Sequence, residues 1–152
     1  MYKHILVPTD GSELSEKAIK SAVSLAKALN ARLTGLFVIP KPSPGDIWDV
    51  WTPGDSDDAK KFRTKFEESF RCAAERHLSV IKQAAQEAGI TCECLFVTGD
   101  LPSEDILKAA EDRGCDLIMM ASHGRTGIKG TLLGSVTMKV LGNTKIPVLV
   151  HR

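Results

Sequence analysis

Apolar positions along the chain follow two alternating patterns: short continuous runs, and longer segments that carry one apolar stripe. The short runs are rich in Val, Ile and Leu and show little polar alternation, which indicates β-strands covered by helices on both faces. Strands are predicted at residues 4–8, 33–39, 92–97, 117–121 and 147–150. Because strand and helix patterns alternate, the sequence predicts a mostly parallel sheet built from βαβ units.

The segments between the strands repeat apolar residues with a period near 3.6, which predicts four helices. In the second helix, phenylalanine recurs at every fourth position (Phe62, Phe66, Phe70). Ser103, which follows a proline, is the expected N-cap of the third. The predicted helices cover residues 12–29, 57–88 and 103–113, and the fourth begins near residue 134. We therefore expect an α/β fold: a five-stranded parallel sheet in a three-layer, doubly wound αβα arrangement.

One segment interrupts this alternation. Residues 40–56 contain four prolines and two glycines, which excludes a continuous helix or strand and predicts a long loop. Trp48 and Trp51 lie in this loop, and two interpretations stay open: packing against the second helix, or a lid or partner contact. The chain of 152 residues otherwise has the length of a single domain, residues 1–152.

The charge balance and the hydropathy of the chain limit the classes of binding partner that the sequence supports. Lysine and arginine number 20, aspartate and glutamate 19, and the formal net charge is +1. This balance does not support a nucleic-acid partner, which usually meets a strongly basic surface. Without a run of 18 apolar residues or a secretory leader, we expect no membrane partner and a cytoplasmic location.

The four cysteines are expected to be reduced thiols, because three of them lie inside apolar periodic segments and pack as small apolar side chains. Cys92 and Cys94 are two positions apart on a predicted strand, so their side chains share one face. A disulfide between neighbours of this spacing is geometrically awkward, and we expect a packed pair of thiols.

Two polar segments follow predicted strands: residues 9–12 after the first strand and the glycine-rich residues 121–135 after the fourth. Glycines let backbone amides approach a phosphate closely, and the helix that starts near Gly134 adds unpaired N–H groups and a positive dipole end. Both segments lie at carboxyl ends of strands, where open α/β sheets bind ligands. The sequence therefore predicts a crevice for a phosphate-bearing ligand, most simply a nucleotide.

Several side chains in these segments have two interpretations. Asp10 is a candidate acceptor for a ribose hydroxyl or an adenine amine, or a cation ligand, but it also suits an N-cap or Asx turn. His123 is a candidate phosphate contact or a turn residue, and Arg125 a phosphate partner or a solvated side chain. Ser135 and Thr137 carry hydroxyls that can donate to phosphate, and Ser135 can instead cap its helix.

Other nucleotide and enzyme signatures are missing from the chain. Lys129-Gly130-Thr131 has the wrong order for a Walker A motif, and the first turn holds one glycine where a dinucleotide fingerprint needs three. The sequence has no G-x-S-x-G elbow for acyl hydrolysis. The cysteines lack the second pair that a zinc site requires, so no metal site is expected from them.

The chain resembles the nucleotide-binding subclass of the universal stress protein family over essentially its whole length. Residues 5–12, Ile-Leu-Val-Pro-Thr-Asp-Gly-Ser, match the family's opening strand and turn. Gly124, nine further residues and Gly134-Ser135 match the second part of its G-x2-G-x9-G-S/T motif. Ala121 stands in place of the first glycine and adds a methyl group where a backbone approaches the ligand.

The resemblance implies an adenine nucleotide alpha hydrolase-like fold and a homodimer that pairs through the C-terminal strand, residues 146–150. It also implies bound ATP or AMP, with Mg²⁺ as a candidate partner of Asp10 through the phosphates. Pro8, Thr9 and Asp10 are expected beside base and ribose, and Val38 beside adenine through its main chain. The residues expected around ribose and phosphates are Gly124, Gly127, Gly134, Ser135, Val136 and Thr137.

Three functions are compatible with these features. The first is an adenine-nucleotide-binding stress-response or signalling protein whose dimer surface is read by other proteins. The second is a weak ATP-hydrolysing or nucleotidyl-transferring enzyme on the same fold, for which only Asp10 and His123 are placed to act. The third is a dimerisation or interaction module with an empty pocket, which Ala121 would favour by closing the site.

Overall fold

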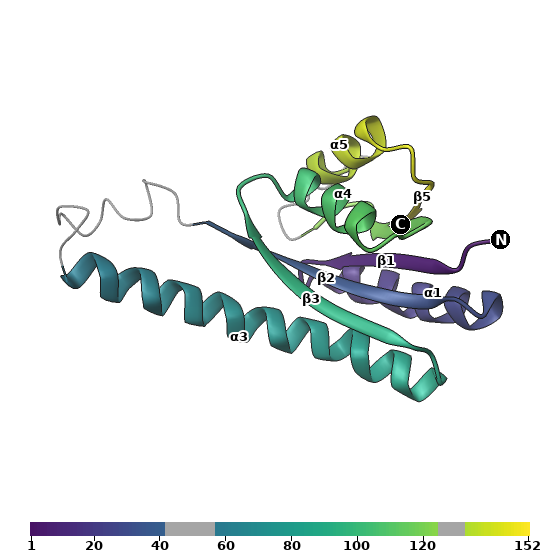
Figure 1. Ribbon diagram of the computed structural model, residues 1–152, viewed down its shortest axis with the longest axis horizontal. Helices are drawn as coiled ribbons and strands as arrows, with labels where there is room; N and C mark the ends of the chain where they lie inside the picture. The colour runs from purple at the N-terminus through teal and green to yellow at the C-terminus, as the bar shows by residue number, and fades with distance from the viewer. Residues whose placement is uncertain (42–56, 125–132) are drawn as a thin grey trace.

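The computed structural model describes residues 1–41, 57–124 and 133–152. Its centre is a five-stranded parallel sheet with the strand order β3-β2-β1-β4-β5 (Figure 1). The predicted strands are confirmed, with shifts only at their ends. They are β1 (His4–Thr9), β2 (Arg32–Pro40), β3 (Cys92–Gly99), β4 (Leu117–Ala121) and β5 (Val148–His151).

Helices cover both faces of the sheet, which confirms the three-layer α/β arrangement. One layer holds α1 and α3, and the opposite layer holds α4 and α5 (Figure 1). Their bounds are α1 (Glu13–Leu29), α3 (Asp57–Ala88), α4 (Pro102–Asp112) and α5 (Ser135–Asn143). None of the helices in the described part of the chain is long and apolar enough to cross a membrane.

The central strand shows how the sequence pattern builds two cores. Successive side chains of a strand point to opposite faces, so Ile5 and Val7 of β1 enter the core under α1 and α3, and Leu6 enters the core under α4 and α5. All three side chains are fully buried. The continuous apolar run therefore reflects burial on both faces, as the sequence predicted.

The order of the strands creates a switch point between β1 and β4. From β1 the chain moves through β2 to β3 in one direction, with α1 and α3 on one face. It then returns across the sheet to β4 and β5, with α4 and α5 on the other face. Right-handed crossovers require this change of face when the direction reverses. The connections that leave β1 and β4 therefore separate and leave space at the carboxyl ends of these strands.

Two sequence expectations were wrong. Burial on both faces fails at the edge strands, where Phe96 of β3 is 40% exposed and Leu149 of β5 is 41% exposed, because two helices per layer do not cover five strands. Ser103 is not an N-cap: α4 begins at Pro102 behind Leu101, and Ser103 is buried inside the helix. Proline suits the first helical position, which starts the helix one residue earlier than expected.

The cysteines are free thiols, but they are not uniformly buried. Cys115 is buried, Cys92 and Cys94 are half-buried against the core, and Cys72 is exposed on α3, so three of the four thiols are packed, as the sequence predicted. The long loop, with Trp48 and Trp51, lies outside the described residues, apart from its first two positions, 40 and 41.

Candidate functional site

The connection from β1 to α1 is a tight, hydrogen-bonded turn. The backbone amide of Ser12 donates to Oδ1 of Asp10 over 3.0 Å, which is an Asx turn, and the amide of Gly11 donates to Oγ1 of Thr9 over 3.2 Å. Gly11 has a φ of +75°, which glycine adopts without strain. The turn interpretation of Asp10 is thus confirmed, and its second oxygen, Oδ2, takes no part in this turn bond.

The start of α1 satisfies its own backbone. Ser12 is the N-cap, and its Oγ accepts a hydrogen bond from the amide of Ser15 over 3.2 Å. Glu13 and Glu16 lie in the first turn, where carboxylates balance the positive end of the helix dipole. This helix start therefore has little remaining attraction for an anion.

The connection from β4 to α5 is held together by backbone carbonyls at the end of the strand. The amide of Gly134 donates to the carbonyl of Ser122 over 2.7 Å. Thr137, which is 2% exposed, donates its hydroxyl to the carbonyl of Ala121 over 3.0 Å. These two bonds fix the start of α5 against the end of β4.

Both motif glycines stand where a side chain would collide with the site. A β-carbon at Gly124 would overlap the carboxylate of Asp10 at Oδ2. A β-carbon at Gly134 would lie 3.2 Å from Cα of His123 and 3.3 Å from the carbonyl oxygen of Ser122. The structure therefore brings Asp10 into contact with Gly124, the first glycine of the loop, as expected if the two connections face one crevice.

Polar groups without partners gather on the glycine side of this contact. Ser122 is fully buried, and its hydroxyl has no hydrogen-bond partner in the described structure; the same holds for Nδ1 of His123. The first turn of α5 contains no acidic residue, and its N-cap, Gly134, supplies no side-chain hydrogen bond. Buried polar groups in native proteins are nearly always paired, so a partner for these two atoms is expected outside the described residues.

The remaining predicted residues lie around this contact. Pro8 and Val38 are half-buried near the carboxyl ends of β1 and β2, and Val136 is half-buried against the core under α4. Ala121 is 8% exposed and, by strand alternation, shares a face with Met119 and the core under α1. Ser135 is exposed as the first residue of α5. Arg125 and Gly127 lie outside the described residues.

Comparison with known proteins decides the family. A model described as the universal stress protein family matches residues 1–152. The chain belongs to the universal stress protein family.

Relatives of this family member cover nearly its whole length. Universal stress protein MJ0577 of Methanocaldococcus jannaschii is 35% identical over 154 residues, which covers 99% of this chain and 94% of the relative. Universal stress protein YxiE of Bacillus subtilis is 34% identical over 157 residues, and the alignment covers 100% of both. The resemblance to the universal stress protein family noted in the sequence is therefore confirmed.

Solved structures agree with the fold. The structure of MJ0577 has a TM-score of 0.81 at 34% identity and covers 99% of this chain and 96% of that one. A crystal structure of a universal stress protein in complex with cAMP has a TM-score of 0.70 at 27% identity, and covers 99% of this chain and 97% of that one. Both confirm the α/β architecture of this family member.

One residue at the site was not recognised from the sequence. His77 of α3 is not among the site residues expected from the sequence, but its imidazole lies against Gly11, where a β-carbon would overlap the ring. The ring also stacks on Phe37, with centroids 5.7 Å apart and 9° between the planes. The sequence signal that could have identified His77 is a polar imidazole within an otherwise apolar stripe of the helix. Its contact with the Asp10 turn depends on how α3 crosses the sheet.

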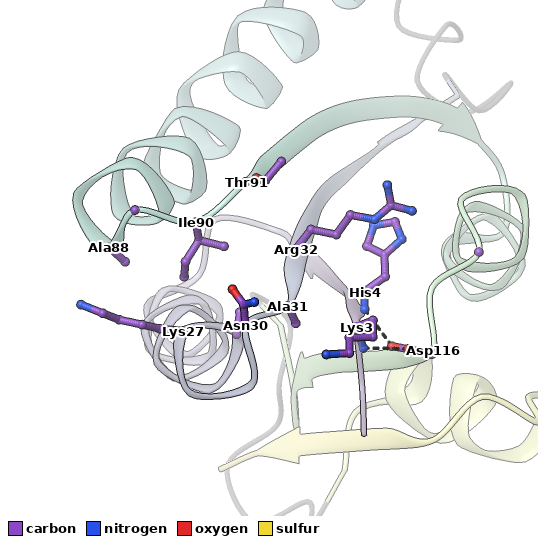
Figure 2. Close-up of a pocket in the computed structure, with 13 residues that line it drawn as sticks. Lys3, His4, Lys27, Asn30, Ala31, Arg32, Ala88, Ile90, Thr91 and Asp116 are labelled. Atoms are coloured by element: carbon purple, nitrogen blue, oxygen red, sulfur yellow. Dashed lines mark hydrogen bonds between the residues drawn. The ribbon is translucent and has the colours of Figure 1, made fainter.

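A cavity of about 560 Å³ lies at the opposite, amino-terminal edge of the sheet (Figure 2). There, the backbone amides of Lys3 and His4 donate to the Asp116 carboxylate over 2.8 and 2.9 Å. Burial opposes ionisation of Asp116, but these hydrogen bonds outweigh it and hold the pKa of the carboxyl below its usual range. None of the predicted site residues that the structure describes lines this cavity.

Buried His4 marks the same edge. It is 5% exposed, and its Nε2 lies 2.7 Å from Oγ1 of Thr34. Burial, together with the nearby charge of Arg32, lowers the pKa of His4 below its usual value, because the charged imidazolium is poorly solvated there. This histidine therefore has a structural role in its neutral form.

No group of three or more His, Cys, Asp and Glu side chains suited to a metal ion occurs within residues 1–41, 57–124 and 133–152.

Proposed function

We propose that this universal stress protein binds an adenine nucleotide, ATP or AMP, in the crevice between the carboxyl ends of β1 and β4. The observation that carries the proposal is the contact of the Asp10 carboxylate with Gly124 at the switch point of the sheet. Parallel α/β sheets bind ligands at such points. The nucleotide acts as a signal in the stress response, because its binding changes the surface that other proteins recognise.

The start of α5 supports the assignment of the phosphates. The amides of Ser135, Val136 and Thr137 belong to the first helical turn, where no carbonyl of the same helix can accept from them. Among the described helices, α1, α3 and α4 each carry acidic residues in the first turn, and α5 carries none. A phosphate group would therefore meet N–H donors and the positive dipole end without a competing carboxylate.

The end of β2 supports the assignment of the base. Pairing between β1 and β2 ends at the Thr9↔Phe37 pair, while β2 continues through Val38 beside β3. Backbone groups of β2 that face β1 beyond this point have no strand partner, and an adenine edge can satisfy them. Pro8 and Thr9 then border the ribose, and Asp10 accepts from a ribose hydroxyl or holds Mg²⁺ through the phosphates.

The relative solved with cAMP supports an adenine ligand, since it shares 27% identity with this chain over nearly its full length. The buried hydroxyl of Ser122 and Nδ1 of His123 fit the same ligand, because both atoms need a polar partner. When bound, the nucleotide supplies polar partners for these two atoms and a negative charge at the start of α5. The residues of the chain bind and orient it.

Nucleotide bound to the purified protein is the direct test. We expect protein that is purified and then denatured to release ATP or AMP, detected by chromatography, and the apo protein to bind Mg-ATP in calorimetry. Apo protein that neither releases nucleotide nor responds to ATP contradicts the proposal and favours an interaction module. Release of phosphate that depends on Mg²⁺ and is lost in Asp10→Ala would instead identify an ATPase.

We also propose that the protein acts as a homodimer through residues 146–150. Strand β5 pairs only with β4 in the sheet, and Leu149 on it is 41% exposed. An apolar edge strand favours pairing with a second copy. Leu149→Lys is expected to shift the protein to monomers in analytical ultracentrifugation. Leu141→Lys, which changes a leucine of similar exposure on α5, serves as the control. A wild-type monomer would contradict the dimer.

We propose that the protein acts in the cytoplasm. The four cysteines are free thiols. Thiols of this kind persist in reducing compartments. Fractionation of cells that produce the protein tests the location.

A further inference from the structure

The imidazole of His77 on α3 contacts both β2 and the turn that follows β1. The ring stacks on Phe37 of β2, with the ring centroids 5.7 Å apart and 9° between the planes. Phe37 is 5% exposed, so its ring is held in the core under α1 and α3. The imidazole also lies against Gly11, because a β-carbon there would overlap three ring atoms, Cε1, Nδ1 and Nε2. His77 therefore connects a fixed part of the core to the turn that carries Asp10.

The hydrogen bonds of this turn fix its shape. The amide of Ser12 donates to Oδ1 of Asp10, and the amide of Gly11 donates to Oγ1 of Thr9. Gly11 has a φ of +75° and no side chain with which to pack, and the backbone of a glycine changes conformation at little cost. The ring of His77 occupies the space beside this glycine, so it blocks movement of the turn toward α3.

The position of the turn decides where the Asp10 carboxylate lies. Gly11 directly follows Asp10, and Oδ2 of Asp10 lies against Gly124 on the other side of the crevice. A shift of the turn therefore moves the carboxylate relative to the glycine loop. Helix α3 is itself anchored, because it packs against β2, β3 and α1. A continuous series of contacts thus runs from α3 through His77 and Gly11 to Asp10.

We propose that His77 is a positioning residue for the nucleotide site: its ring, stacked on Phe37, holds Gly11 in place so that the Asp10 carboxylate faces the glycine loop. This inference rests on the proposed binding of a nucleotide and adds a requirement to it. The ring meets Gly11 where a β-carbon would project, so it touches the apolar Cα of this residue. His77 therefore acts through the shape of a planar ring, and phenylalanine should replace it.

The first test compares Mg-ATP affinity in calorimetry with thermal unfolding for His77→Ala and His77→Phe. His77→Ala should weaken binding by about 10-fold, which lies within the range of couplings between residues in contact. His77→Phe should keep the affinity within about 2-fold of wild type, because its planar ring can stack on Phe37 and fill the space beside Gly11. A residue that only packs in the core would change the thermal midpoint and leave the affinity unchanged.

Ile81→Val is the matched control. Ile81 lies one turn further along α3, is fully buried, and lies against Gly35 of β2 instead of Gly11. Loss of one methylene group should lower the thermal midpoint by a few degrees and leave the affinity unchanged. Equal affinities of wild type and His77→Ala overturn the proposal. A His77→Phe variant as weak as His77→Ala also overturns it and assigns the imidazole a polar role.

Amide hydrogen exchange of the apo protein tests the position of the turn without nucleotide. The amides of Gly11 and Ser12 should exchange about 10-fold faster in His77→Ala, because loss of the ring lets the turn open locally. In His77→Phe and Ile81→Val they should exchange at the wild-type rate. Unchanged exchange in His77→Ala overturns the inference. Wild-type protein that binds no Mg-ATP contradicts the proposed function alone, and the expected exchange pattern then still supports the hold of His77 on the turn.

Discussion

The helix starts of α1 and α5 follow neighbouring strands at the same edge of the sheet, yet they differ in the side chains that stand beside their free backbone amides. At α1, Ser12 caps the helix, and Glu13 and Glu16 stand in the first turn. At α5, Gly134 supplies no side-chain cap, and the first turn carries no acidic residue. Both helices have the same dipole, so the side chains alone distinguish a completed helix start from one suited to an anion.

The two starts also differ in what holds them. The turn before α1 is held by short-range hydrogen bonds that the backbone amides of Gly11 and Ser12 donate to the side chains of Thr9 and Asp10, two residues earlier. The start of α5 is held by the carbonyls of Ala121 and Ser122, from the preceding strand. The first turn is therefore an independent local structure that offers Asp10 to the second. Three predictions test this division of roles, and a fourth tests the opposite edge of the sheet.

Gly124→Val should have the largest effect, because the new side chain overlaps the carboxylate of Asp10 and pushes the two connections apart. Overpacking costs about 1–3 kcal/mol, so we expect Mg-ATP affinity in calorimetry to fall by up to about 100-fold. Gly142→Val is the control, since a β-carbon at this exposed glycine of α5 meets no atom within 4 Å. If the two variants bind Mg-ATP with equal affinity, the contact between Asp10 and the glycine loop has no role in nucleotide binding.

Asp10→Asn separates the turn from the ligand. The asparagine keeps an oxygen that accepts from Ser12, so thermal stability should stay within about 0.5 kcal/mol of wild type. The negative charge is lost, and a hydrogen bond to a charged group contributes about 1.5–3 kcal/mol, so affinity should fall about 10-fold or more. Asp10→Ala should lose both properties. Unchanged affinity in Asp10→Asn would restrict this residue to the turn.

Ser135→Asp makes the start of α5 resemble that of α1. The added carboxylate should stabilise the helix by about 0.3–1 kcal/mol and weaken ATP binding about 10-fold by repelling the phosphates. Asn143→Asp puts the same charge at the far end of α5, about 12 Å away, beyond the reach of screened electrostatics. Its affinity should match wild type. Equal weakening in both variants would indicate a general charge effect.

The smallest effect is expected at the amino end of β1, where buried His4 has no link to the ligand. Its pKa is lowered from 6.5, so below that pH the unfolded chain binds more protons than the folded one. The stabilisation from neutral His4 should therefore be fully present above about pH 6.5. The free energy of unfolding should decrease as the pH falls below that value. In His4→Gln, denaturant titrations should show a flatter pH dependence. If the free energy of unfolding changes equally with pH in wild type and His4→Gln, then His4 does not cause the pH dependence.

Much of the architecture followed from the sequence, because it depends on local pattern. The strand around Leu6 was predicted because a continuous apolar run requires burial on both faces, and its neighbours in the chain supply the helices. The position of Asp10 and of the glycine-rich segment at the same edge of the sheet was also predicted, since both follow parallel strands. Ser103 was misassigned because the preceding proline, not the serine, decides where α4 begins.

Contacts between distant elements could not be predicted in the same way. The packing of His77 on Gly11 and the exposure of Phe96 depend on where α3 crosses the sheet and where the sheet ends. The bond from Thr137 to the carbonyl of Ala121 depends on how closely α5 approaches β4. A single sequence specifies the side chain at each of these positions but not its partner.

The amino-acid sequence by itself determined the class of fold, the order of its elements and the two connections that carry polar residues, because periodicity and turn chemistry act over a few residues. Only the tertiary structure decided that β1 and β4 are neighbours, that Asp10 touches Gly124, and that the sulfurs of Cys92 and Cys94 lie 3.9 Å apart. The reason is that strand order and side-chain packing arise from contacts between segments far apart along the chain.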